Sequence, residues 1–275
     1  MRTTDQAMTA NGMSISDQLA RHARKIPDET ALRFEGAGRS YRELDERVAR
    51  LGNALADRGV RPGDRVAVVG LNCLEIVESY LAVVRVGAIC VPINFRLVAD
   101  EIAYALTDSG ARAVIVDTAL AGAVAAAREQ VPGVATCLVI GGAGGSGDES
   151  FEAALASAAP EHAGIAVDEG APAFIMYTSG TTGRPKGAVL THRNLLMHTF
   201  SSMVHNGVTN EDRVWLVGVP LFHIAGLAGM LPYLLLGGRS VIAPSSRFDP
   251  REIVELLARE RVTSCFFVPA QWQAI

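Results

Sequence analysis

The sequence lacks several patterns that would assign it to a common class of protein. No block of like charges occurs, and a net charge of −4 argues against a nucleic-acid groove or a polybasic membrane patch. The N-terminal residues lack the apolar core of a signal peptide. No pair of cysteines has Cys-x-x-Cys spacing, so zinc and dithiol redox motifs are unsupported. The thiols sit in apolar contexts and fit a reducing compartment, so we expect a cytoplasmic protein. The cysteines are Cys73, Cys90, Cys137 and Cys265.

Long hydrophobic runs are also absent. The longest apolar stretch, residues 224–236, contains two glycines and Pro232. It is too short to cross a bilayer, which takes about 20 residues, so we expect a buried helix and no transmembrane segment. A chain of 275 residues can bury a large core and lies near the size at which one core divides into two.

Helix and strand signals alternate along the chain. Ser40 and Glu43 have the spacing of a capping box, and apolar residues then repeat at helical spacing towards Gly59. Residues 66–69 follow as a continuous apolar strand. Strands without polar alternation, each separated by a helix, are typical of a parallel sheet covered on both faces. The sequence therefore predicts an α/β fold.

The pattern divides into two α/β blocks. We expect residues 1–15 to be disordered or loosely attached, 16–170 to form the first subdomain, and 171–275 to form the second. A glycine-rich loop at 141–150 is typical of a flexible linker. Residues 268–275 read as a helix start without a C-cap, which predicts a truncated second subdomain.

The most informative segment runs from Tyr177 to His192. Its loop consists of glycines and hydroxylated residues, and Lys186 follows. Such a loop suits a polyphosphate, because its N–H and O–H groups can approach an anion and the ammonium adds positive charge. The apolar strand candidate at 173–177 places the loop at the carboxyl end of a strand, where open α/β sheets bind ligands. The loop residues are Thr178, Ser179, Gly180, Thr181, Thr182 and Gly183.

This loop is not a Walker A motif. That motif ends in Gly-Lys-Ser/Thr, whereas here Pro185 precedes the lysine and a glycine follows it. A P-loop kinase or ATPase is therefore disfavoured. A flexible surface turn is the structural alternative, since Gly, Ser and Thr are common in turns.

The segment resembles the phosphate-loop signature of the adenylate-forming superfamily, which includes acyl-CoA synthetases, aryl-CoA ligases, luciferases and peptide-synthetase adenylation domains. Residues 87–97 resemble the Gly-Ala-x-x-x-Pro-x-Asn block of that family, and residues 220–226 resemble its Pro-Leu-Phe-His block. The resemblance extends from about Ser16 to the last residue. It implies two stacked, mostly parallel sheets with helices on their faces, as part of the large N-terminal domain. The C-terminal lid domain of the family would be absent.

The resemblance also implies roles for individual residues. The six loop residues and Lys186 would hold the ATP phosphates, and Mg²⁺ would bridge the same phosphates without a protein metal site of its own. His223 would lie near the substrate carboxylate and the α-phosphate, with Phe222 and Ile224 as apolar walls of the acid pocket. A core histidine bonded to a main-chain carbonyl is the alternative for His223. His192 is expected only to begin a helix behind the N-cap Thr191.

The implied reaction has two steps. ATP and a carboxylate give an acyl-adenylate and pyrophosphate, and coenzyme A then displaces AMP. A fatty acid is the expected substrate, because the variants at 94–97 and 222–223 look more like fatty-acyl and related small-acid synthetases than peptide-synthetase adenylation domains. An aryl-acid ligase and a non-catalytic, nucleotide-binding or self-associating fragment remain as alternatives. Later motifs of the family would lie beyond residue 275, so we expect negligible adenylation by these residues alone.

Overall fold

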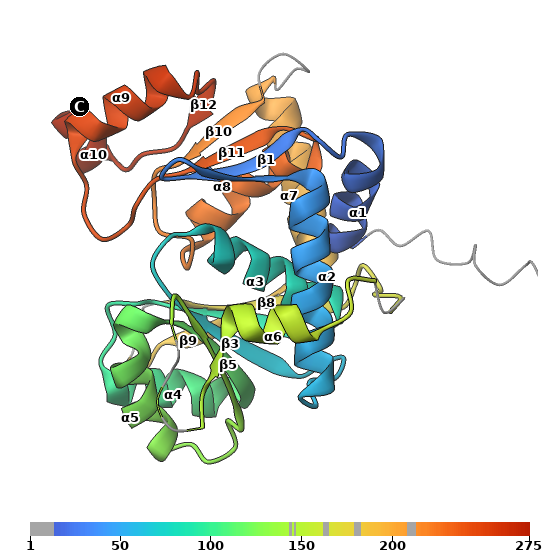
Figure 1. The fold of residues 1–275 in the computed structure, drawn as a ribbon. Helices are drawn as coiled ribbons and strands as arrows, with labels where there is room; N and C mark the ends of the chain where they lie inside the picture. The colour runs from blue at the N-terminus through green and yellow to red at the C-terminus, as the bar shows by residue number, and fades with distance from the viewer. Residues whose placement is uncertain (1–13, 143–144, 146, 162–164, 179–182, 208–212) are drawn as a thin grey trace, which may run out of the picture.

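The computed structural model describes residues 14–142, 145, 147–161, 165–178, 183–207 and 213–275. Within these residues the strands form two sheets, of seven and five strands, stacked with helices between them (Figure 1). This confirms the predicted α/β fold with two stacked, mostly parallel sheets.

The seven-stranded sheet has the order β7-β6-β5-β3-β4-β8-β9. All neighbouring strands run parallel except β8 and β9, which form an antiparallel hairpin at one edge. Its inner strands β3, β4 and β5 and the neighbouring β6 are rich in β-branched residues and mostly buried, as a covered parallel arrangement requires. Their bounds are β3 Arg65–Val69, β4 Ile89–Ile93, β5 Ala111–Asp117, β6 Thr136–Ile140, β7 Glu149–Ser150, β8 Pro172–Thr178 and β9 Lys186–Thr191.

The five-stranded sheet has the order β12-β10-β11-β1-β2. Here β1 pairs in parallel with β11, although more than half of the chain separates them, and β2 closes the edge as an antiparallel partner of β1. The bounds are β1 Thr30–Phe34, β2 Ala37–Ser40, β10 Val214–Val217, β11 Arg239–Ile242 and β12 Ser264–Cys265.

The largest hydrophobic cluster fills the layer between the two sheets, with α1, α2, α3, α6, α7 and α8 contributing to it. A second cluster lies under α4 and α5 on the outer face of the seven-stranded sheet, and a third lies under α9. The helices are α1 Ile15–Lys25, α2 Tyr41–Asp57, α3 Leu74–Arg85, α4 Ala99–Ser109, α5 Ala121–Glu129, α6 Phe151–Ser157, α7 His192–Asn206, α8 Ile224–Leu235, α9 Pro250–Arg259 and α10 Pro269–Ala274.

The sheets do not follow the predicted division of the chain at residue 170. Strands β8 and β9 come after that point but belong to the sheet of β3–β7, while β1 and β2 come before it and join β10–β12. The 170/171 boundary therefore does not coincide with a boundary between sheets. The reason is non-local pairing, which no local pattern in the sequence encodes.

Several local signals are confirmed. Ser40 Oγ accepts a hydrogen bond from Glu43 N at 3.2 Å, and the Glu43 carboxylate accepts one from Ser40 N at 2.7 Å, as a capping box requires. Thr191 caps α7 in the same way through Asn194, and Asp249 with Pro250 begins α9. In the last strand, β12, only Ser264 and Cys265 pair with β10 before the chain turns towards α10.

The N-terminal boundary also needs a correction. Ser14 and Ile15 fall in the segment predicted to be loosely attached, yet both are buried. Ser14 caps α1 by accepting a hydrogen bond from Asp17 N at 3.2 Å, and Ile15 contributes to the central core. Residues 1–13 lie outside the described residues.

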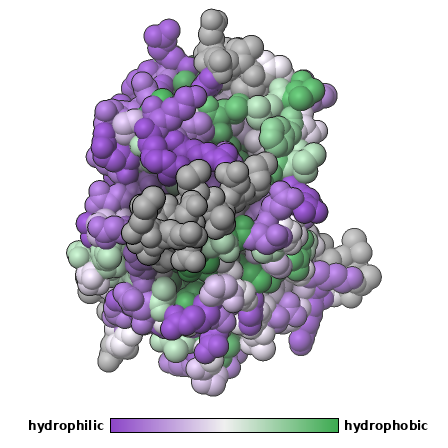
Figure 2. Space-filling model, turned by 90° about the vertical axis from the view of Figure 1, so that its right-hand side faces the viewer, coloured by the Kyte–Doolittle hydropathy of each residue, from purple (hydrophilic) through white to green (hydrophobic). Residues whose placement is uncertain are grey.

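The surface is mixed, with hydrophobic patches among hydrophilic residues on the face shown in Figure 2. Two large hydrophobic side chains in or next to α10, Trp272 and Ile275, are 54% and 43% exposed. Helices in the described ranges all fall short of the length and apolarity needed to cross a membrane.

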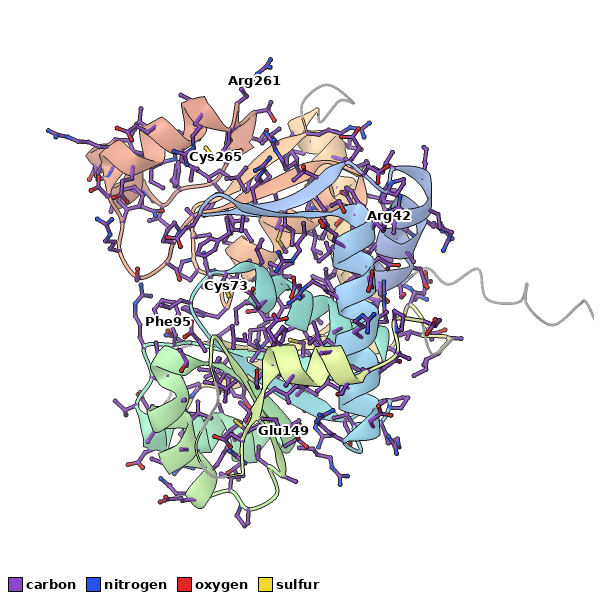
Figure 3. All side chains as sticks on the ribbon, in the orientation of Figure 1. Arg42, Cys73, Phe95, Glu149, Arg261 and Cys265 are labelled. Carbon is purple, nitrogen blue, oxygen red and sulfur yellow. The ribbon has the colours of Figure 1, made fainter. Side chains whose placement is uncertain are left out.

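The four cysteines are free, as their spacing predicts. Cys73 is the N-cap residue of α3 and Cys265 is the last residue of β12, and the two lie apart in Figure 3. Burial raises the pKa of every thiol, in the case of Cys137 to about 12, so thiolate chemistry is suppressed.

A buried carboxylate ties α3 to its neighbours. Glu78 on α3 is fully buried, and its Oε1 accepts hydrogen bonds from Arg39 Nε and Arg47 Nε, each at 2.8 Å. Arg47 also pairs with Glu152 at the start of α6. Burial raises the pKa of Glu78, and the two arginines oppose that rise. The arrangement connects β2, α2, α3 and α6 through charge-assisted bonds.

Replacing Glu78 with alanine should destabilise the fold strongly. Two half-buried guanidinium groups would lose their shared partner, although Glu152 still pairs with Arg47. We expect the free energy of unfolding in urea to fall by about 3 kcal/mol, the lower end for a broken buried pair.

The control is Glu46→Ala, which removes an exposed i, i+4 pair with Arg50 and should cost only about 0.3–0.5 kcal/mol. A loss as small as the control's in the Glu78 variant would contradict a structural role for this carboxylate.

Candidate functional site

The candidate site lies at the carboxyl edge of the seven-stranded sheet. Because β4 and β8 run parallel, with Cys90 opposite Phe174, their ends at Ile93 and Thr178 meet at this edge. A cavity of about 950 Å³ opens there between α4, the β8–β9 hairpin and the start of α8. This is the position at which open α/β sheets bind ligands.

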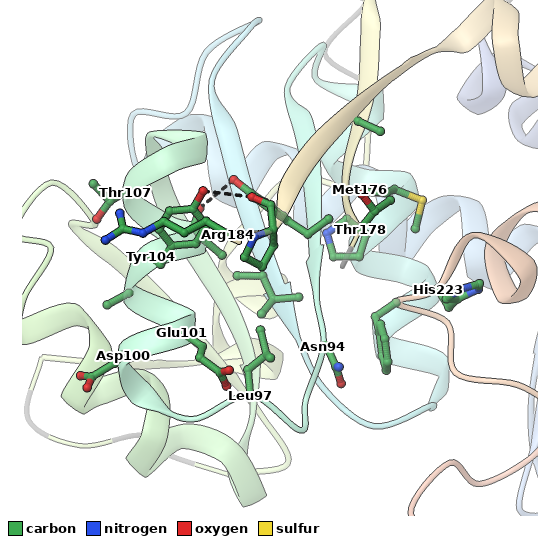
Figure 4. Close-up of a pocket in the computed structure, with 18 of the residues that line it drawn as sticks. Asn94, Leu97, Asp100, Glu101, Tyr104, Thr107, Met176, Thr178, Arg184 and His223 are labelled. Atoms are coloured by element: carbon green, nitrogen blue, oxygen red, sulfur yellow. Dashed lines mark hydrogen bonds between the residues drawn. The ribbon is translucent and has the colours of Figure 1, made fainter. Parts of the chain in front are cut away.

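The ends of the cavity differ in chemistry. Figure 4 shows Tyr104 and Arg184 at one end and His223 at the other, with Thr178 between them. Most of the lining is apolar, and Leu97 and Phe222 contribute to it. A mainly apolar cavity with a few convergent polar groups is typical of a small-molecule site.

The predicted phosphate loop connects the two strands of the hairpin. Thr178 and Lys186 face each other across β8 and β9, and Thr178 Oγ1 donates a weak hydrogen bond to the Lys186 carbonyl at 3.5 Å. Both residues are exposed. Gly183 has φ +127°, a conformation that favours glycine. The other predicted loop residues, at 179–182, lie outside the described residues.

The C-terminal arm of the loop is attached to α4 by aromatic residues. Tyr104 donates a hydrogen bond to the Pro185 carbonyl at 3.0 Å, and the Arg184 guanidinium lies 5.3 Å from the centre of the Tyr104 ring. Tyr177 Oη donates to Asp108 at 2.7 Å, and burial together with this bond raises the pKa of Tyr177. These contacts fix where the hairpin leaves the sheet.

The Pro-Leu-Phe-His segment forms the opposite side of the cavity. His223 is exposed and is the N-cap of α8, where its Nδ1 accepts a hydrogen bond from Ala225 N at 3.1 Å. This bond keeps Nδ1 unprotonated, so in the neutral ring the proton is on Nε2. The imidazole therefore presents an N–H donor at its other nitrogen.

The main chain around this segment is tightly constrained. A Cβ atom at Gly226 would lie 2.5 Å from the Pro220 carbonyl oxygen, so only glycine lets α8 begin this close to the loop. Phe222 packs edge-on against Phe95, which follows β4, with ring centroids 5.3 Å apart. The wall of the cavity thus combines residues from both sheets.

Asn72 joins the two sheets behind the same wall. Its buried side-chain amide donates to the Val219 and Ala243 carbonyls at 3.1 and 3.2 Å, and its Oδ1 accepts from Leu221 N at 2.8 Å. Its main-chain N–H donates to Ser245 Oγ at 2.8 Å. Asn72 lies in the loop between β3 and α3, so the loop that precedes Phe222 is hydrogen-bonded to a loop of the seven-stranded sheet.

His192 lies away from the cavity lining. It is the first residue of α7, as predicted, and is fully buried, with Nδ1 accepting a hydrogen bond from Ile15 N at 3.3 Å. Burial lowers the pKa of His192 to about 4, while the Asp17 carboxylate acts weakly in the opposite direction. The imidazole is therefore neutral at neutral pH and links α7 to α1.

The sequence therefore brings some of its predicted site residues together. Thr178, Phe222, His223 and Ile224 all line one cavity, while Gly183 and Lys186 are on the hairpin outside the lining. Sequence reasoning missed Asn72 and Tyr104. Neither carries a local signal, because an asparagine after a strand resembles a turn residue and a tyrosine within a helix resembles a core residue.

Protonation of His192 should destabilise the protein in mild acid. Its folded pKa lies below the ordinary value of 6.5, so the unfolded chain binds the proton more tightly and stability falls as pH decreases from about 6.5 towards about 4. The loss should approach about 1.4 kcal/mol for each unit of difference between the two pKa values. Urea unfolding across this pH range measures it.

His192→Gln should flatten the pH dependence in that window, whereas His198→Gln, at an exposed position of the same helix, should leave it unchanged. An unaltered pH slope in the His192 variant would show that another group titrates.

Comparison with known proteins places this geometry in context. A family model described as "AMP-binding enzyme" matches residues 19–275. Feruloyl-CoA synthase from Amycolatopsis sp is 41% identical over 256 residues, which cover 93% of this chain and 48% of that protein. A long-chain-fatty-acid–CoA ligase from Thermus thermophilus is 37% identical over 239 residues, covering 86% and 43%. This chain thus spans about half the length of the curated relatives it matches.

A solved structure shows the same arrangement. The crystal structure of a putative long-chain-fatty-acid CoA ligase from Rhodopseudomonas palustris superposes with a TM-score of 0.86 at 33% identity, over 94% of this chain and 64% of that one.

Proposed function

The chain belongs to the family of AMP-binding enzymes, and we propose that it forms the phosphate-binding and acid-binding part of an AMP-forming CoA ligase. One observation carries the proposal: the strand end that begins the phosphate loop and the Phe222–His223 segment line the same cavity, although they come from different sheets. A polyphosphate on the hairpin and a carboxylate beside His223 would therefore be close enough to react.

The first step joins the acid to AMP. A carboxylate oxygen attacks the α-phosphorus of ATP, the bond from that phosphorus to the bridging oxygen breaks, and pyrophosphate leaves with the electron pair. Negative charge increases on the leaving group, so preorganised donors at the hairpin stabilise the transition state. Thr178 supplies a hydroxyl and Lys186 an ammonium group there; Ser179, Gly180, Thr181, Thr182 and Gly183 complete the proposed set.

His223 acts on the acid side in this proposal. Its Nδ1 is held by Ala225 N, so Nε2–H is the donor that can orient a carboxylate oxygen. Phe222 and Ile224 exclude water from the acid beside it. In the second step the thiol of coenzyme A loses its proton to solvent and its sulfur attacks the acyl carbon. A carbon–sulfur bond forms, the bond from the acyl carbon to the phosphate oxygen breaks, and AMP leaves with that electron pair.

Mg²⁺ enters the proposal through ATP, whose phosphate oxygens are its usual ligands in such sites. Across the described ranges, no cluster of three or more His, Cys, Asp or Glu side chains could hold a metal ion. The ion supplies charge neutralisation on the phosphates when bound.

Two classes of acid compete for the cavity. A fatty acid is the prediction from the sequence, and the apolar lining suits an alkyl chain. An aromatic acid is the second candidate, because the Phe222 ring in the cavity lining is a surface against which a flat ring can pack. The relative from Amycolatopsis sp is a feruloyl-CoA synthase, and this supports the aromatic candidate.

The test is ATP–pyrophosphate exchange with the native protein, isolated from its own cells and weighed intact by mass spectrometry. The panel pairs saturated acids with aromatic acids of similar length. Acid-dependent exchange supports the proposal, and the acid with the highest kcat/KM identifies the class. Exchange that no acid stimulates would refute the ligase and leave a nucleotide-binding or self-associating protein.

Lys186 allows a selective prediction, because the chain has only one other lysine, Lys25. Lys186→Met should lower the exchange rate by about 10²–10³, the usual cost of losing one preorganised charge-stabilising group. Lys25→Met is the matched control, since Lys25 ends α1 and is exposed away from the cavity lining. Equal rates for the two variants would remove Lys186 from the site.

Binding is measured separately by acetylation. Mg·ATP should protect Lys186 but not Lys25, read by peptide mass spectrometry, and this holds even if turnover is slow. Equal protection of both lysines would contradict a phosphate site at the hairpin.

A further inference from the structure

Asn72 connects the two sheets through its hydrogen bonds. It follows β3, and β3, β4 and β8 are neighbours in the seven-stranded sheet, so its main chain is continuous with the sheet that carries the phosphate hairpin. Its side chain, however, points into the loops at the carboxyl ends of β10 and β11, which belong to the other sheet.

The contacts of this side chain are complete. Asn72 is 3% exposed, both amide hydrogens have carbonyl acceptors, and Oδ1 has a main-chain donor. A buried amide that satisfies three main-chain groups specifies one geometry, because a shift would leave polar groups unpaired. The adjacent bond from its N–H to Ser245 Oγ fixes the β11–α9 loop as well.

Two of these partners come just before residues 222–223, which face the acid in the proposed function and are called the acid-facing segment. Val219 and Leu221 stand just before Phe222 and His223, and Gly226 holds the other end of the segment against Pro220. The segment is therefore restrained on both sides. The restraint at its start comes from the sheet that carries Thr178.

We propose that Asn72 is a positioning residue for the acid: it sets the place of Phe222 and His223 relative to the phosphate hairpin. This inference rests on the proposed function and adds a residue that never touches substrate. The hairpin itself is held by Tyr104 and Tyr177, so loss of Asn72 should move the acid-facing wall and leave the phosphate side in place.

Three variants of the native protein test the inference. Asn72→Ala removes all three side-chain bonds. Asn72→Asp keeps the acceptor for Leu221 N but turns an oxygen towards the Val219 and Ala243 carbonyls. Asn53→Ala is the matched control, because the Asn53 amide also donates to two main-chain carbonyls, those of Ala159 and Glu161 at 2.8 Å, far from the cavity lining.

The first readout is amide hydrogen exchange, which needs no activity. In both Asn72 variants the segment 219–223 should exchange about tenfold faster or more, while β8 and β9 keep wild-type rates. The Asn53 control should leave 219–223 unchanged. Wild-type exchange at 219–223 in Asn72→Ala would overturn the inference, whatever the protein's function.

The second readout separates positioning from simple destabilisation. The KM for the acid should rise about tenfold or more in Asn72→Ala, because displacement of the cavity wall by about 1 Å is enough for a large loss of activity. The KM for ATP should stay within about twofold of the wild-type value. A parallel rise in both KM values, or a loss of melting temperature with unchanged KM for the acid, would reduce Asn72 to a structural residue.

A fourth variant covers the case in which Asn72→Ala does not fold. Ser245→Ala removes the hydrogen bond that Ser245 Oγ accepts from the main-chain N–H of Asn72. The KM for the acid should rise by about threefold, and amide hydrogen exchange at 243–245 should become faster. An unchanged KM in a folded Ser245 variant and in Asn72→Asp would overturn the inference. Absence of acid-dependent ATP–pyrophosphate exchange in the wild type would instead refute the proposed ligase. Amide hydrogen exchange would then still decide whether Asn72 holds residues 219–223 in place.

Discussion

The parallel pairing of β4 with β8 is the contact on which the candidate site depends. It attaches the hairpin from the second half of the chain to the sheet built by the first half. Parallel strands end at one edge, so the loop after β8, the block after β4 and the loop after β3 all face the same side. This pairing brings the segments of the site near one another, and the contacts of Tyr104 and Asn72 then hold these segments in their final positions.

The layers around that edge have different physical roles. Between the sheets, a continuous apolar core and the Glu78 ion pairs hold α2, α3 and α6 in register. At the edge itself, the described charges are exposed and only lightly paired, as for Lys186 and Arg184. The buried charges are thus fixed in ion pairs between the helices, while the exposed cations at the edge remain accessible to an anion.

Local chemistry accounts for most of what the sequence could predict. The Ser40 capping box, the Thr191 N-cap of α7 and the apolar strands each depend on residues close in sequence, and each is present. The loop after β8 stands out in the sequence because glycines and hydroxyls are concentrated in it, and its role in phosphate binding stays a prediction. The pairing of β1 with β11 was not predictable, because its energy comes from partners roughly two hundred residues apart that no local pattern links. Asn72 and Tyr104 were missed for the same reason, since their partners are defined only by the folded chain.

The close approach at Gly226 has a consequence for how such a cavity can evolve. The main chain of residues 220–226 is fixed by the contact of Gly226 with Pro220 and by the hydrogen bond from Leu221 N to Asn72. The side chains of Phe222 and Ile224, which line the cavity, are free to differ in size. Substitution at these two positions would reshape the wall without displacing its backbone. In the proposed ligase, selectivity for the acid and placement of the phosphates would then be separable traits, so that one could change while the other stays fixed.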